Sequence, residues 1–342
     1  MKRTYEDLKR DVWETGRCSG CGACVAVCPA NAIIFREGSP DAHPVHTGYC
    51  KEATDGVPCG ACYGVCPRTD ERRAAAESLP LLGEYQDILS ARATFEIERK
   101  QSGGAVTAIL RNALEEDLID AVVTVGEDRW TMKPFSTLIT SSGDLVHHAG
   151  SRYNWWVPTL AILKEAVVRR KCRHIAVIGV PCVVSAINAM RESDNDLLRP
   201  YARAVRLVVG LFCTESFDYR KLIGDMLGGV YGIEPWQIRR LNVRGALEVS
   251  GVGGLIQSIP LRDLESCIRP GCLHCTDFTA VHADISAGAV GSPDGYTTLL
   301  VRNSVGRGFV ERALQNGLLE EGERPSLAPI ERLAAKKSER VP

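Results

Sequence analysis

The chain has 342 residues, which is enough for two or three globular domains, and its apolar content of 45% is ordinary for a soluble protein. Its 41 basic and 42 acidic residues leave a net charge of −1, so the composition indicates no surface for nucleic acid or for an anionic membrane. The 14 cysteines are the feature that requires a chemical explanation.

The N-terminal stretch MKRTYEDLKRDVWETG is charged throughout and lacks the apolar core of a secretory signal. The longest apolar runs, such as LVVGLF, are far shorter than the ~20 residues that cross a bilayer. We therefore expect a cytoplasmic protein without a membrane span. In a reducing compartment its cysteines would serve as metal ligands and not as disulfides.

Residues 1–75 carry eight cysteines in two ferredoxin-type runs. CSGCGACVAVCP has the bacterial ferredoxin spacing, in which three thiolates hold one 4Fe–4S cluster and the fourth reaches a second cluster. CKEATDGVPCGACYGVCP repeats the motif with six extra residues after its first cysteine. A zinc site needs four ligands but does not need two cysteine runs of this spacing, so the runs favour iron–sulfur clusters over zinc. We predict a ferredoxin-like domain with one cluster on Cys18, Cys21, Cys24 and Cys66, and a second on Cys50, Cys59, Cys62 and Cys28.

Residues 76–100 are mixed in character and suit a connector. Over residues 101–320, helix and strand patterns then alternate: GGAVTAILRNALEE predicts a helix, DAVVTVG a buried strand, and RHIAVIGVPCVVSAINAMRES a strand followed by a helix. YTTLLVRN and GRGFVERALQNG add a further strand and helix. The pattern predicts an α/β body with a largely parallel sheet. Residues 321–342 are polar and are expected to form a tail or a surface helix.

QSGGAVTAIL is a candidate phosphate site. Ser102, Gly103 and Gly104 directly precede a predicted helix, whose free backbone amides attract phosphate, and glycines permit close approach. An ordinary N-cap at Ser102 explains the same residues, and local sequence leaves both interpretations open. No GxGxxG motif follows a predicted strand, so a standard dinucleotide fold is not indicated.

Five stretches in order carry a family resemblance: QSGGAVTAIL, AGSRY, VIGVPC, LFCTESF and CLHCTDFTAVHADISAGAVGSPDGYTTLLVRN. Over residues 80–310 the chain resembles the beta subunits of coenzyme F-420-reducing hydrogenases and F-420-dependent dehydrogenases. With the cysteine runs in front, its layout is most similar to the input subunit of the reduced-F-420 dehydrogenase complex. The resemblance implies an FAD-binding body that exchanges a hydride between FAD and coenzyme F-420, without a catalytic side chain.

The resemblance also implies which residues contact FAD. The positions that match the family motifs are Ser102, Gly103, Gly104, Val106 and Thr107 near the phosphates and ribose, Ser151, Arg152 and Tyr153 around the flavin, and Asp277 and Asp284 in the pocket wall. A helix or turn cap explains Asp284 equally well.

A second cysteine group lies in the body. Cys182 and Cys213 each follow a predicted strand, and ligands in open α/β sheets gather outside the carboxyl ends of strands. With Cys272 and Cys275 they supply four thiolates for a third 4Fe–4S cluster, and the family resemblance implies the same four. Cys267 gives a plant-type ferredoxin spacing and is a spare candidate, whereas Cys172 is expected to be an unligated thiol.

Together these expectations describe an FAD and iron–sulfur oxidoreductase that takes a hydride from reduced F-420 and passes single electrons onward. The partner would be a hydrogenase, a formate dehydrogenase, a membrane-bound dehydrogenase complex at which the chain docks peripherally, a heterodisulfide reductase or ferredoxin. Two alternatives stay open. One is an electron-transfer adaptor without hydride chemistry, and the other is a flavin reductase of the same fold that acts on another substrate.

Overall fold

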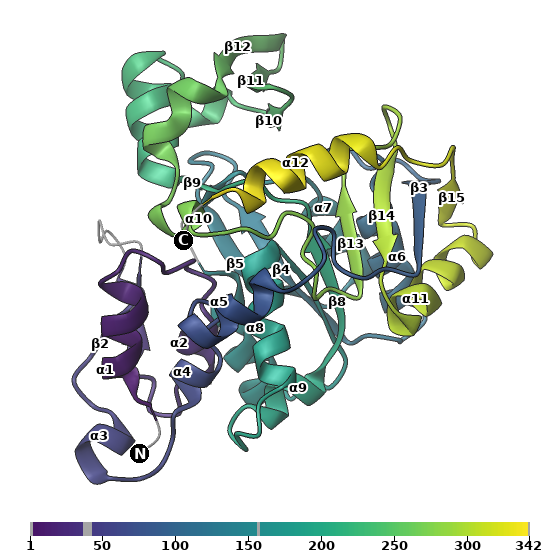
Figure 1. Cartoon of the computed structure of the whole chain (residues 1–342). Helices are drawn as coiled ribbons and strands as arrows, with labels where there is room; N and C mark the ends of the chain where they lie inside the picture. The colour runs from purple at the N-terminus through teal and green to yellow at the C-terminus, as the bar shows by residue number, and fades with distance from the viewer. Residues whose placement is uncertain (1–2, 37–42, 156–157, 341–342) are drawn as a thin grey trace.

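A computed structural model describes residues 3–36, 43–155 and 158–340 of the chain. Figure 1 shows a small N-terminal head at the lower left, a body built on one wide sheet, and a lobe that projects from the body. Helix α10 (Pro270–Leu273) lies where these parts approach one another.

The body contains an eight-stranded sheet with the order β15–β3–β14–β13–β8–β7–β4–β5. Five strands share one direction: β3 (Asp87–Ala93), β13 (Ile285–Gly288), β8 (Val205–Leu211), β7 (Ile175–Gly179) and β4 (Ala121–Glu127). Three strands run the other way: β14 (Thr297–Val301), β15 (Leu319–Glu321) and β5 (Pro134–Ile139). The carboxyl ends of the five like-directed strands therefore meet at one edge of the sheet.

Alternate residues of the central strands pack into two apolar cores, one on each face of the sheet. The first core holds Val123 and Val177 and is covered by α8 (Pro181–Arg191), α9 (Arg199–Ala204), η2 (Thr159–Ile162) and η3 (Glu165–Arg169). The second core holds Val122 and Ala176 and is covered by α6 (Ala105–Glu115) and α11 (Ser304–Gln315). The predicted α/β body is confirmed, with the parallel centre of its sheet buried on both faces.

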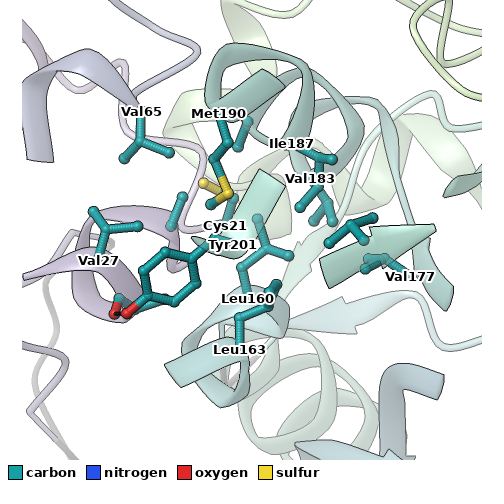
Figure 2. Packing of buried hydrophobic residues seen from close by; sticks show 14 of the residues in the cluster. Cys21, Val27, Val65, Leu160, Leu163, Val177, Val183, Ile187, Met190 and Tyr201 are labelled. Carbon is teal, nitrogen blue, oxygen red and sulfur yellow. Dashed lines mark hydrogen bonds between the residues drawn. The ribbon is translucent and has the colours of Figure 1, made fainter. Parts of the chain in front are cut away.

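The head, residues 3–36 and 43–69, consists of short elements: α1 (Tyr5–Leu8), η1 (Lys9–Trp13), α2 (Ala23–Val27), β1 (Ile33–Ile34), β2 (Val45–His46), α3 (Lys51–Asp55) and α4 (Ala61–Gly64). Figure 2 shows Val27 and Val65 of the head in the same apolar cluster as Leu160 of the body. The Tyr201 hydroxyl donates a hydrogen bond to the Ala26 carbonyl across the boundary, at 2.9 Å. Head and body thus share one core, which fixes their relative position.

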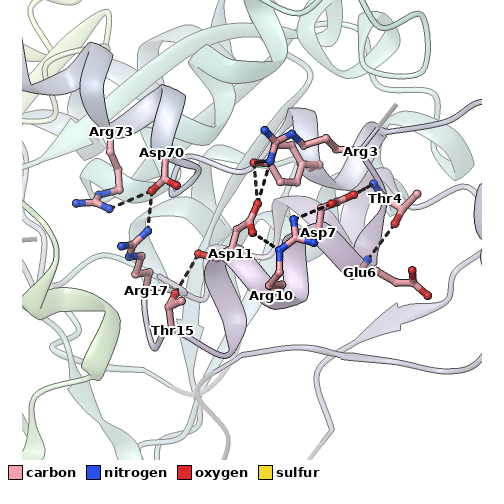
Figure 3. Close-up of polar contacts among 11 residues, drawn as sticks. Arg3, Thr4, Glu6, Asp7, Arg10, Asp11, Thr15, Arg17, Asp70 and Arg73 are labelled. Carbon is pink, nitrogen blue, oxygen red and sulfur yellow. Dashed lines mark hydrogen bonds and ion pairs between the residues drawn. The ribbon is translucent and has the colours of Figure 1, made fainter. Parts of the chain in front are cut away.

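Polar contacts tie the start of the head to α5 (Asp70–Glu77), as Figure 3 shows. Asp11 accepts hydrogen bonds from Arg3 and Arg10, and Asp70 accepts from Arg17 at 2.7 Å. At least one side chain of each ion pair is exposed to solvent, so each pair adds at most about 1 kcal/mol of stability. They orient α5, which begins just after the last head cysteine.

The lobe, residues 217–268, was not predicted from the sequence. Its elements are β9 (Phe217–Asp218), η4 (Arg220–Val230), η5 (Pro235–Gln237), the antiparallel strands β10 (Arg240–Val243), β11 (Ala246–Gly251) and β12 (Gly254–Pro260), and η6 (Leu261–Cys267). It has an apolar core of its own, which includes Leu222, Leu247 and Ile259. β9 pairs with β6 (Asn154–Trp155) of the body, which places the lobe beside the carboxyl edge of the sheet.

Two segments differ from their expected roles. The expected connector, 76–100, contains β3, an inner strand of the sheet. Segment 321–342, expected to be a tail or a surface helix, contains the helix α12 (Ala328–Ser338), but its Ile330, Ala334 and Lys337 are buried. Tertiary packing, which local composition does not record, makes both segments part of the body. In the described ranges, the helices are too short or too polar to cross a membrane.

Candidate functional site

The head cysteines lie close to other members of their predicted sets. Burial raises the pKa of Cys24, and so do the nearby thiols of Cys18, Cys21 and Cys66 from its own predicted set and that of Cys62 from the other. Burial, followed by Cys28, Cys59 and Cys50, raises the pKa of Cys62 to about 12. Thiols perturb one another in this way only at short range, because the effect is a repulsion between thiolates. Each predicted set contains the four thiols that a 4Fe–4S cluster would require.

Glycines allow the chain to wrap around each set. Gly22 and Gly60 occupy equivalent places in the two cysteine runs, and each adopts a left-handed conformation, with φ of +86° and +62°. Each also begins the short helix that carries the next cysteine. A residue with a side chain would be strained at either position. Within the described ranges, no group of three or more His, Cys, Asp or Glu is placed to hold a single metal ion.

The third predicted set assembles at the carboxyl edge of the sheet. Cys182 lies in the first turn of α8 directly after β7, and Cys213 lies just beyond β8. Burial raises the pKa of Cys182 to about 12, with contributions from Cys275 and Cys272. Burial of its thiol also raises the pKa of the half-buried Cys213, and the same two thiols raise it further. The backbone N–H of Ser216 donates to the Cys272 sulfur at 3.4 Å. The structure thus brings together Cys182, Cys213, Cys272 and Cys275.

The two remaining cysteines lie elsewhere. Cys267 is 2% exposed and belongs to the apolar core of the lobe. Its charged neighbours are Lys221, Asp225 and Asp218. Cys172 lies beside Asp120 and Arg170. The structure therefore does not bring the spare candidate Cys267 into the third set.

The third set lies directly against the first head set. Cys21 contributes to the raised pKa of Cys182, so these two thiols are neighbours across the head–body boundary. A side chain at Gly271, beside Cys272, would lie 2.1 Å from the Cys18 carbonyl oxygen, so α10 approaches the first cysteine loop at backbone distance. A continuous series of thiol sets therefore runs from the sheet edge through the head.

The predicted phosphate motif lies in the loop between β3 and α6. Gly104 precedes α6 with φ of +75°. A Cβ atom at Gly103 would lie 2.5 Å from the Ala91 carbonyl oxygen, and the Ser102 hydroxyl is 2.9 Å from that of Thr297. Close packing on β3 and β14 explains Gly103 without a ligand. The first turn of α6, which contains Val106 and Thr107, lies at the carboxyl edge of the sheet. The backbone amides of a first turn have no acceptor within the helix.

The motif around residues 150–153 lies beside this loop. A Cβ atom at Gly150 would be 2.9 Å from the Arg99 carbonyl oxygen. The Gln101 side-chain amide donates to the Tyr153 hydroxyl at 3.2 Å. Arg152 donates to the Gly150 carbonyl, and burial lowers its pKa. Burial raises the pKa of Tyr153, and a hydrogen bond with the adjacent Ser151 partly offsets this rise. The two predicted FAD motifs are thus brought together.

A cationic cavity of about 320 Å³ opens next to these motifs. It lies between the end of β4 and α7 (Ser142–His147), and its lining residues are Arg99, Glu127, Arg129, Asp144, His147, His148 and Arg152. Guanidinium groups bind phosphates and carboxylates through charge-assisted hydrogen bonds, so the cavity suits an anionic group. Of its lining, the sequence predicted Arg152 alone; the His147–His148 pair directly before AGSRY was an available signal.

The two predicted aspartates have different surroundings. Asp277 accepts hydrogen bonds from the backbone of Ala280 and Val281 and lines a cavity of about 210 Å³ beside Cys182 and Cys275. Asp284 is 3% exposed. It precedes β13, at the amino edge of the parallel strands, and accepts from Val208, Asn303 and Arg191. Its carboxylate is therefore engaged by donors within the protein, which agrees with the structural interpretation of this residue.

These features define a class of protein: an iron–sulfur protein with a ferredoxin-like head fixed to an α/β body. Residues 88–164 match the N-terminal model of the coenzyme F-420 hydrogenase/dehydrogenase beta subunit, and residues 172–326 match its C-terminal model. Residues 11–34 match a 4Fe–4S binding domain. The chain belongs to the family of coenzyme F-420 hydrogenase/dehydrogenase beta subunits, whose members are parts of oxidoreductases.

Individual relatives agree with this assignment. An uncharacterized protein of Methanocaldococcus jannaschii is 42% identical, with 100% of this chain and 99% of the relative covered. One subunit of the F(420)H(2) dehydrogenase from Methanosarcina mazei is 28% identical, with 92% and 88% covered. A chain in a xenon-derivatized structure of the F-420-reducing NiFe hydrogenase complex from Methanosarcina barkeri superimposes with a TM-score of 0.72 and is 30% identical, with 76% and 91% covered.

Proposed function

We propose that this chain is the F-420-oxidising subunit of a redox system. In this account it takes a hydride from reduced F-420 at an FAD in the body and passes single electrons through three 4Fe–4S clusters to a partner protein. Bound FAD would supply the conversion between a two-electron hydride and single-electron transfer. The adjacency of the third cysteine set to the first head set carries the proposal, because it links the body to the head without a gap.

The side chains of the body would bind and orient the cofactors. Arg152 and Arg99 border the cationic cavity and would hold anionic groups of the nucleotide or of the deazaflavin coenzyme. The first turn of α6 would present backbone amides to a phosphate. Cys275 is buried and Cys182, Cys213 and Cys272 are half-buried, which would limit the access of water to the sulfur ligands. No general base or nucleophile is needed for this chemistry.

The relatives' names support a subunit role. One is a subunit of a dehydrogenase, and another is part of a hydrogenase complex. The second cysteine set lines an open pocket of the head, so a redox partner would dock at the head. A hydrogenase, another dehydrogenase, a heterodisulfide reductase or ferredoxin would each serve as this partner.

The proposal is tested by cofactor analysis of the chain reconstituted without oxygen. We expect one FAD and iron for three clusters per chain, together with oxidation of reduced F-420 by the isolated chain. Clusters without FAD, and no F-420 oxidation, would instead indicate an electron-transfer adaptor. FAD without F-420 oxidation would indicate a flavin reductase for another substrate.

A further inference from the structure

Three buried cations border the proposed path between the third cysteine set and the first head set. They come from three segments far apart in the sequence: Lys337 of α12, Arg68 of the head and Arg269 just before α10. Their exposed fractions are 2%, 8% and 2%. Charges in a buried region are screened less than charges in water, so these cations act strongly on charged groups beside them.

Lys337 serves the third set. Its ammonium group donates to the Cys213 carbonyl, and its charge acts on Cys275, Cys213 and Cys272. α12 also supplies the apolar side chains Ile330 and Ala334 to the body core. Packing therefore holds the charge beside the sulfur ligands.

Arg68 lies between the two sets. It follows the Cys66–Pro67 pair of the head, reaches into the body and donates to the His274 carbonyl at 2.9 Å. Its charge acts on Cys275, Cys182 and Cys272 of the third set. It also acts on cysteines of the first set, including Cys18 and Cys21.

Arg269 serves the first set. It donates to the Ser19 carbonyl, and its guanidinium carbon lies 3.7 Å from the centre of the Trp155 ring. Its charge acts on Cys18 and Cys21. A Cβ atom at Gly20 would lie 2.4 Å from the guanidinium, so the cysteine loop closes directly over this cation.

We infer that Lys337, Arg68 and Arg269 set the reduction potentials of the inner cluster and the first head cluster. This inference rests on the proposed third cluster. Reduction adds one negative charge to a cluster, and a fixed cation nearby favours the reduced form, so it raises the potential. Lys337 acts on the inner cluster, Arg269 on the first head cluster, and Arg68 on both.

The test is an anaerobic redox titration of the reconstituted full chain, followed by electron paramagnetic resonance and absorbance. Lys337→Gln is expected to lower one midpoint potential, Arg269→Gln to lower a different one, and Arg68→Gln to lower both. Each affected midpoint potential should fall by about 59 mV or more. For a one-electron couple, this fall reduces the ratio of reduced to oxidised cluster at least tenfold at a fixed potential. Arg72→Gln is the control, because Arg72 pairs with Glu192 and is partly exposed.

Charge-conserving variants separate the electrostatic role from a structural one. Lys337→Arg, Arg68→Lys and Arg269→Lys should keep the midpoints near those of the unaltered chain. If a neutral variant loses a cluster, rescue by its charge-conserving counterpart supports the inference, and failure of rescue overturns it. Three clusters with unmoved midpoints would overturn this inference alone. Iron for only two clusters in the unaltered chain would overturn the proposed third cluster, and with it this inference.

Discussion

At the scale of single residues, the 14 cysteines are distinguished by their neighbours and not by their burial. Cys267 and Cys275 are both buried, yet Cys267 belongs to the apolar core of the lobe with Lys221 as a cationic neighbour, whereas Cys275 lies beside Arg68, Lys337 and the thiol of Cys182. Burial raises the pKa of Cys275, but Arg68 and Lys337 outweigh that effect and lower it.

We predict that Cys272→Ser removes the inner cluster and leaves the two head clusters in place. Iron content should fall by one cluster, and electrons from reduced F-420 should no longer reach the head. Cys267→Ser, in the lobe core, is the matched control and should leave iron content unchanged. Normal reduction of the head clusters in Cys272→Ser would show that the third set is not on the path.

Arg152→Gln tests the cationic cavity. Loss of a charge-assisted hydrogen bond costs about 1.5–3 kcal/mol, so the affinity for FAD should fall about tenfold or more. FAD is titrated into flavin-free protein, and binding is followed by flavin fluorescence. Arg169→Gln is the control, because its side chain is 76% exposed on η3. Equal affinities for the two variants would remove Arg152 from the site.

At the scale of elements, the approach of α10 to the first cysteine loop requires a glycine. Gly271→Ala would place a methyl group 2.1 Å from the Cys18 carbonyl oxygen, so the two segments must separate. We expect a loss of about 1–3 kcal/mol of stability and a lower melting temperature. Gly253→Ala, at the open tip of the β11–β12 hairpin, meets no atom within 4 Å and should have little effect. Equal melting temperatures would show that the close approach is not required.

Removal of iron should affect the head more than the body. The head elements are short and depend on their proposed clusters, whereas the sheet has apolar cores on both faces. Hydrogen exchange of the iron-free chain should show lost protection over residues 18–36 and 43–66 and retained protection in β7 and β8. Unchanged protection in the head would mean that its packing against the body is sufficient to fold it.

The elements show which parts of the fold a sequence reveals. α6, β4, β7, α8, β8, β14 and α11 were predicted because each has an apolar pattern that is complete within the element. We did not predict the strand β3 from its sequence DILSARA. This stretch becomes an inner strand because it pairs with β14 and β15, which are more than 200 residues away in the chain. α12 was expected to be polar because its buried face includes Lys337.

The same distinction applies to the candidate site. The cysteine sets follow from spacing and from the rule for strand ends, and the structure brings the same residues together. Lys337, Arg68 and Arg269 carry no local signal, because each is recognised only by contacts with segments far away in the chain. Asp284 matched a family motif, yet its hydrogen bonds to Val208 and Asn303 place it at the opposite edge of the sheet.

At the scale of the whole molecule, one core joins the head to the body, and the three cysteine sets follow one another along that junction. A fixed junction keeps the proposed carriers at constant separation. Lys337 of α12 and Arg340 donate hydrogen bonds to the carbonyls of Cys213 and Cys272, so the C-terminal segment borders the third set.

The most direct test of this account is an anaerobic stopped-flow mix of the reconstituted chain with reduced F-420. We predict rapid return of the oxidised deazaflavin absorbance, followed by bleaching of the flavin and then of the clusters. In Cys272→Ser the first two changes should persist and bleaching of the head clusters should be lost. Cluster bleaching that precedes flavin reduction, or that survives in Cys272→Ser at the normal rate, would contradict the proposed path.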